Sequence, residues 1–200
     1  MISRAQFFVL TKLDSDGLSA LKRRNQLPVI NAADREYSPF EAFAYLIAER
    51  LVDAPDGHGM NRSMAAEIVR DAASLIARRG PDIEASAPMF RYGDGSADHY
   101  AGRLHVATEQ FSRSDAFVGT KAELAETLAG AGTVFGVNVT NITASFVLLQ
   151  RRAAGEGIDI SGMWPDPASL PTAEDRVQRI AANWRAAITK TNNDRGFGEE

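Results

Sequence analysis

The sequence predicts a mostly α-helical protein of the α+β class, and three observations indicate this. Apolar residues recur at helical spacing in several segments that begin with a capping residue and end at glycine, asparagine or proline. Two short segments instead alternate apolar and other residues, as strands with one buried face do. The 200 residues, 44% hydrophobic and 24% charged, have the balance of a folded chain that can bury a core.

The N-terminal segment is predicted to form two short helices. Ser3 caps the first helix, which ends by Leu13. The second covers residues 15–24 and is basic at its end, where Asn25 tolerates a left-handed backbone and Pro28 prevents continuation.

Two longer helices are predicted to follow. Ser38 and Pro39 are an N-cap and a first-turn proline for a helix over residues 40–52. Apolar spacing predicts another helix over residues 62–79, which Gly80 ends together with the proline after it.

The second half is predicted to mix strands and helices. Strands are expected over residues 103–110 and 134–139, and helices over 120–130, 141–154 and 177–188.

These elements suggest a division of the chain into parts. We expect an N-terminal domain over residues 1–80, a linker over 81–102, a C-terminal α+β module over 103–190 and a disordered tail over 191–200. No internal repeat is evident.

Composition excludes several classes of function. The absence of cysteine excludes disulfides, thiolate zinc sites and a cysteine nucleophile. No run of about 18 apolar residues occurs and the N-terminus lacks a secretory pattern, so we expect a cytoplasmic protein without a membrane partner. The net charge of −4 argues against a protein coated in nucleic acid, although residues 1–35 carry six basic and three acidic residues.

The two N-terminal helices have the pattern of a helix-turn-helix. A tight turn between two helices lets the second lie in the major groove of DNA while the first braces it. The basic cluster Lys22, Arg23 and Arg24 would then contact phosphates. The alternative is a solvated helix end, where basic residues favour the helix dipole.

Two stretches, LSALKRRNQLP over residues 18–28 and REYSPFEA over 35–42, strengthen the first interpretation. With Leu46 at the spacing of the next core leucine, residues 14–51 resemble the winged-helix DNA-binding domain of the MerR-type transcription regulators. In that family the second helix ends in a basic element, and the wing leads into Arg-x-Tyr-Ser before another helix. The family also includes excisionase-like relatives that bend DNA.

The resemblance implies residue roles. By position, Arg35 and Tyr37 of the wing approach the DNA backbone, and the end of the second helix faces the groove. The chain departs from the family at Ser19, where an arginine is usual, at Ala20 and Leu21, where an aromatic pair is usual, and at Asn25, where a glycine is usual. The DNA-contacting residues that we expect are Arg4, Ser15, Ser19, Lys22, Arg23, Arg24, Arg35, Tyr37, Arg151 and Arg152.

The last two of these residues come from a second candidate helix-turn-helix over residues 120–158. Its intervening segment, 129–139, is long for a tight turn, so the alternative is a capped helix, a strand and a helix that pack together. In a helix-turn-helix the residues facing DNA would be Thr140, Asn141, Thr143, Arg151 and Arg152.

The sequence favours neither a metal nor a cofactor. The run from Asp94 to His99 lacks the ligand spacing of an EF-hand or a zincin helix. We find no nucleophile elbow, phosphate-binding glycine loop or paired catalytic carboxylates, and therefore do not expect an enzyme.

We therefore expect a sequence-specific regulator that binds double-stranded DNA as a homodimer, since two half-sites add affinity. The alternative is a protein-binding adaptor or anti-regulator that keeps the winged-helix shape, and a protein partner could also bind the C-terminal module. A third hypothesis is a hydrolase centred near Asp98 and His99.

Overall fold

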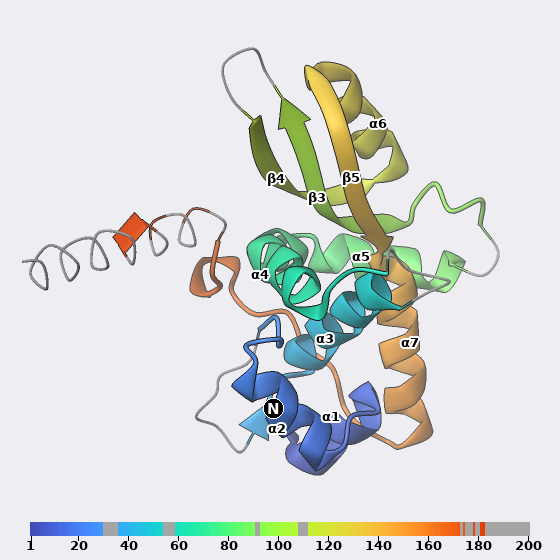
Figure 1. Ribbon diagram of the computed structural model, residues 1–200. Coiled ribbons are helices and arrows are strands. Elements are labelled where there is room, and N and C mark those ends of the chain that lie inside the picture. The colour runs from blue at the N-terminus through green and yellow to red at the C-terminus, as the bar shows by residue number, and fades with distance from the viewer. Residues whose placement is uncertain are drawn as a thin grey trace, which may run out of the picture.

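The protein is described by a computed structural model (Figure 1). The described residues are 1–29, 36–53, 59–90, 93–107, 112–172, 174, 178, 181 and 182. Within them the fold is mixed α and β, with seven α-helices and two small antiparallel sheets, which confirms the α+β class. The predicted helix over residues 177–188 and the tail lie almost wholly outside the described residues.

The N-terminal end carries the two predicted short helices. They are α1 (Arg4–Thr11) and α2 (Ser15–Arg23). Strand β1 (Ile2–Ser3) precedes α1 and pairs antiparallel with β2 (Glu36–Tyr37), which brings the chain back beside its own start. Asn25 has a φ of 52°, the left-handed conformation that its sequence position predicts.

Helix α3 (Pro39–Val52) lies at the centre of the molecule. Ser38 caps it in a reciprocal capping box with Glu41, and the helix is buried on nearly all sides. It packs between α4 (Arg62–Arg78) and α7 (Ile142–Gly155).

Residues at the start of the predicted linker are helical instead. Helix α5 (Gly80–Ser86) and a 3₁₀ turn (Ala87–Met89) bury Ile83 in the main core. The proline after Gly80 does not end the structured region, because proline is tolerated in the first turn of a new helix.

A three-stranded sheet forms the opposite end of the molecule (Figure 1). Its strands are β3 (His99–Ala107), β4 (Ser112–Thr120) and β5 (Thr133–Asn141), in the order β4-β3-β5 with antiparallel neighbours. Helix α6 (Lys121–Gly130) connects β4 to β5 and packs its leucines beside Leu104 of the sheet.

The prediction of a second helix-turn-helix over residues 120–158 is wrong. Strand β5 lies between α6 and α7, so no tight turn joins the two helices. The order of the alternative, a capped helix, a strand and a helix, is what forms, with α6 packed against β4 and α7 against α3 and β3.

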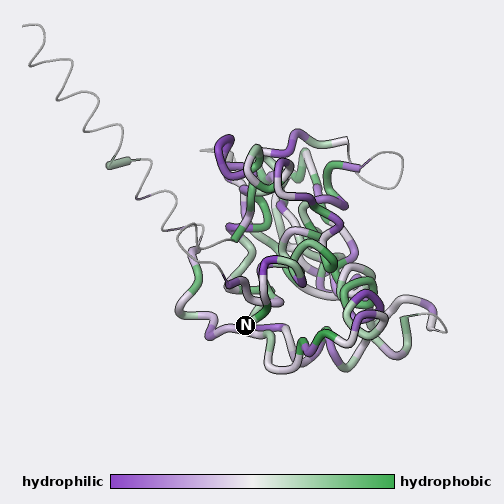
Figure 2. The backbone as a smooth tube through the Cα atoms, turned by 90° about the horizontal axis from the view of Figure 1, so that it is seen from below, coloured by the Kyte–Doolittle hydropathy of each residue, from purple (hydrophilic) through white to green (hydrophobic). Residues whose placement is uncertain are grey.

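The hydropathy of the chain agrees with a core that is formed by one face of most helices. Seen from the end that carries α1 and α2, hydrophobic and hydrophilic stretches alternate along the chain, as amphipathic helices require (Figure 2). In the described part of the chain, no helix combines the length and the apolar character needed to span a membrane.

Candidate nucleic-acid interface

Helices α1 and α2 form a tightly connected pair. Lys12, Leu13 and Asp14 separate them; Lys12 takes a left-handed conformation with a φ of 62°, and the Asp14 carboxylate accepts a hydrogen bond from the backbone of α2. Leu18 and Leu21 are 1% and 8% exposed, so one side of α2 is fixed in the core. The opposite side is free to meet a partner.

The outer side of α2 is polar and basic. Ser15, Ser19 and Arg23 recur every four residues and are all exposed, so they share one face of the helix. Arg24 is exposed at the end of the helix, and Lys22 is half-buried beside it. These side chains offer hydroxyl groups along the helix and guanidinium groups at its C-terminal end.

Arg4 links the two helices at their outer surface. Its guanidinium donates a hydrogen bond to the Ser15 hydroxyl at 2.9 Å and lies 5.3 Å from the ring centre of Phe8. The side chain is exposed, so it adds a positive charge next to the first turn of α2.

Tyr37 has a different place from the one that the resemblance implies. Pairing of β2 with β1 turns the tyrosine inward, where it is 2% exposed and stacks on Phe7 with ring centres 4.4 Å apart. The Nζ of Lys22 donates to its hydroxyl at 3.3 Å. A buried tyrosine cannot lie along a DNA backbone, so its contribution here is to position Lys22. Arg35, the other wing residue, lies outside the described residues.

Arg70 of α4 is a positioning residue that the sequence did not reveal. Its guanidinium donates to the carbonyl oxygens of Leu27 and Pro28 at 2.8 and 2.9 Å, and approaches the side-chain oxygen of Asn25 at 3.4 Å. These bonds fix the segment that leaves α2. An arginine on an amphipathic helix carries no local signal of such a contact, which depends on the tertiary fold.

The two C-terminal arginines do not form a second basic surface. Arg151 is exposed on α7, but Arg152 is half-buried and donates to the carbonyl oxygen of Leu10 at 2.6 Å. Burial lowers the pKa of Arg152. Arg152 therefore ties α7 to the end of α1.

The residues expected to contact bases in the second half are structural. Thr143 is fully buried and accepts a hydrogen bond from the backbone of His99 at 2.9 Å. Asn141 caps α7 and donates to the Asp98 carboxylate at 2.7 Å.

The region of the hydrolase hypothesis contains a buried histidine. His99 is 5% exposed, and burial lowers its pKa, so the ring is neutral at pH 7. It lines an open cavity of about 580 Å³ together with Arg79, Asp82 and Glu123. Among the described residues, no group of three or more histidine or carboxylate side chains could hold a metal ion.

No protein-family model and no curated protein matches this chain. The resemblance of residues 14–51 to MerR-type regulators therefore stays a prediction.

Proposed function

We propose that this protein is a sequence-specific DNA-binding regulator of the winged-helix type, with α2 as the helix that enters the major groove. The observation that carries the proposal is the α1–α2 pair, in which a three-residue turn presents an exposed, basic helix face. An α-helix fits the major groove, and side chains on one face of it can reach base edges.

The charge distribution supports this assignment. Residues 1–29 carry five basic and two acidic residues, in a chain whose net charge is −4. Helices α1 and α2, whose residues include most of these basic positions, lie at the end of the molecule opposite the three-stranded sheet (Figure 1). Local positive charge at α2 would orient the protein on DNA, because phosphate contacts supply affinity and register.

Roles within the interface follow from the exposed positions. Ser15 and Ser19 face the bases, and Arg23 and Arg24 contact phosphates at the end of the recognition helix. The Tyr37 hydroxyl holds Lys22 at the edge of the same surface. A nine-residue helix offers few contacts, so the proposal includes a homodimer that reads two half-sites about one helical turn apart.

The test is a fluorescence-anisotropy titration of the protein on its own upstream DNA and on random DNA between 50 and 200 mM salt. The variant is Arg23→Ala/Arg24→Ala. If each arginine neutralises one phosphate, the slope of log affinity against log salt concentration becomes shallower by about 1.8.

A matched control removes two positive charges elsewhere. Arg78 is exposed at the end of α4, and Arg113 is 58% exposed on β4. Arg78→Ala/Arg113→Ala should leave both the affinity and the salt slope unchanged. Equal losses of DNA affinity in the two double variants would show that the effect comes from net charge and not from α2. Absence of any binding at micromolar protein would favour the protein-binding adaptor.

A further inference from the structure

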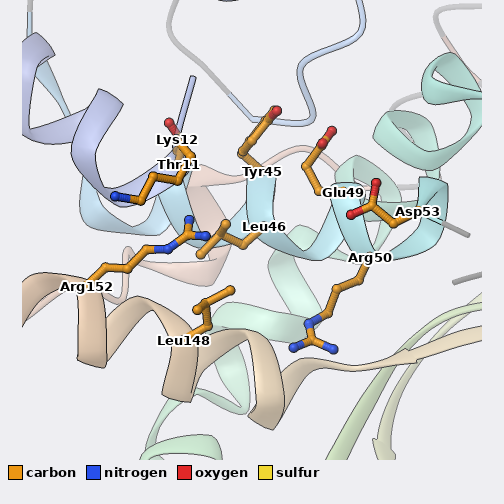
Figure 3. A pocket seen from close by; sticks show the side chains of 9 residues that line it. All are labelled: Thr11, Lys12, Tyr45, Leu46, Glu49, Arg50, Asp53, Leu148 and Arg152. Atoms are coloured by element: carbon orange, nitrogen blue, oxygen red, sulfur yellow. The ribbon is translucent and has the colours of Figure 1, made fainter. Parts of the chain in front are cut away.

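A pocket of about 380 Å³ lies where α1, α3 and α7 meet (Figure 3). Lys12 lies at the end of α1, Arg50 comes from α3, and Arg152 comes from α7. Leu46 and Leu148 lie between the two arginines and form an apolar wall. Three cationic side chains from three separate helices therefore line one cavity.

The two arginines lack carboxylate partners. The Nε of Arg50 is shielded from solvent and has no hydrogen-bond partner among the described residues. Arg152 donates to the carbonyl oxygen of Leu10, and no described carboxylate lies within ion-pair distance of either arginine. Burial lowers the pKa of Arg152, as expected for a cation without a neighbouring carboxylate.

Two acidic residues also line the pocket, but they do not neutralise it. Both carboxylate oxygens of Glu49 bond to the guanidinium of Arg62, which lies outside the lining. Asp53 is exposed where α3 ends. With Glu49 matched by Arg62, the positive charges of the lining exceed the remaining negative charge.

We propose that this pocket binds a small organic anion, with a carboxylate or phosphate group held by the cationic side chains of the lining and an apolar part against Leu46 and Leu148. Guanidinium groups bond such anions through paired, charge-assisted hydrogen bonds. The volume lies within the range of small-molecule sites. The bound anion would neutralise the excess positive charge of the lining.

The site also adjoins the proposed DNA-binding helices. Lys12 is the first residue of the turn into α2, and Arg152 holds the carbonyl of Leu10 near the end of α1. An occupied pocket would fix the base of the α1–α2 pair. Only this coupling rests on the proposed function, because binding of the anion itself needs no DNA.

The test is isothermal titration calorimetry of the full chain with three probes at constant ionic strength: inorganic phosphate, phenyl phosphate and benzoate. We expect one site per chain, with phenyl phosphate bound more tightly than inorganic phosphate because of the apolar wall. Tighter binding of benzoate than of phenyl phosphate would indicate a carboxylate ligand. Tighter binding of phenyl phosphate would indicate a phosphorylated ligand.

The decisive variant is Arg50→Gln, which removes a guanidinium whose Nε has no hydrogen bond to lose and so should still fold. We expect it to weaken binding of the preferred probe at least tenfold, and Arg152→Lys to weaken it less because a charge remains. Arg78→Gln, an exposed arginine on α4, is the matched control and should bind as the wild type does. Lack of binding by all three probes, or equal binding by Arg50→Gln and wild type, would overturn the proposal. DNA titrations do not enter this result, so the two proposals can fail separately.

Discussion

Gly80→Ala tests the packing around α5, because helix propensity and side-chain packing change the free energy of unfolding in opposite directions there. Gly80 is the first residue of α5, and its Cα lies against the indole ring of Trp164. That indole is also held by a hydrogen bond from its Nε1 to Glu84 at 2.9 Å. Helix propensity favours alanine over glycine by up to about 1 kcal/mol, whereas the packing opposes it.

The structure sets the size of the opposing effect. A Cβ on residue 80 would lie 2.3 Å from Cδ2 of Trp164, whereas ordinary van der Waals contact is 3.4–4 Å, so the ring must withdraw by roughly 1.1–1.7 Å. The ring lies 5.6–6.1 Å, centre to centre, from Phe40, Phe43 and Phe146, so its movement disturbs three aromatic contacts. Overpacking costs about 1–3 kcal/mol, and each aromatic pair contributes about 0.5–1.5 kcal/mol. If the ring shift costs the equivalent of one aromatic pair, the net loss after the gain in helix propensity is about 0.5–4.5 kcal/mol.

Urea unfolding followed by far-UV circular dichroism measures this loss. Gly130→Ala is the matched control, because Gly130 ends α6 and a Cβ there meets nothing within 4 Å. The control should be neutral or stabilising by up to about 1 kcal/mol. A Gly80→Ala protein as stable as the wild type, or more so, would show that helix propensity outweighs the contact with Trp164 and that the packing argument is wrong.

Three further predictions concern stability. Arg103→Met removes the guanidinium that donates to the buried Asp71 carboxylate at 2.6 Å and should lower the free energy of unfolding by about 3–5 kcal/mol; a loss below 1 kcal/mol in urea would contradict this. Ser38→Ala breaks the capping box of α3 and should lower the free energy of unfolding by about 1 kcal/mol in the same assay. An unchanged free energy of unfolding would mean that this cap does not contribute to stability. Burial lowers the pKa of His99, so the unfolded chain binds that proton more readily and stability should fall as the pH drops below about 6.5. His99→Gln should reduce this fall between pH 7.5 and 5.5, and an unchanged pH dependence would exclude His99 as its source.

Local signals account for the parts of the fold that could be predicted. The Ser38–Pro39 pair placed the start of α3, and Asn25 marked the left-handed residue after α2. The helix predicted over residues 62–79 is α4, which ends at Arg78. In each case the residue type acts on its own backbone within one turn, so the sequence alone carries the information.

Elements that depend on distant partners were missed. Strand β4 (Ser112–Thr120) contains charged and small residues with little alternation, and it is stabilised by pairing with β3 along its whole length. Helix α5 begins with a Gly-Pro pair that usually ends structure, and Trp164, far along the chain, packs against it. Pairing and packing of this kind are tertiary effects that override local preference.

The candidate interface likewise combines features set by local sequence with features set by tertiary contacts. The sequence identified the exposed residues of α2, but not the two arginines that hold the α1–α2 pair to the body. Arg152 bonds to Leu10, 142 residues away, and Arg70 bonds to the carbonyls of Leu27 and Pro28. Helices as short as α1 and α2 are unstable alone in water, so their orientation depends on such contacts and on buried leucines. A helix that binds a groove loses less conformational entropy when the protein already fixes its orientation, so the proposed interface would depend on arginines that need not touch DNA.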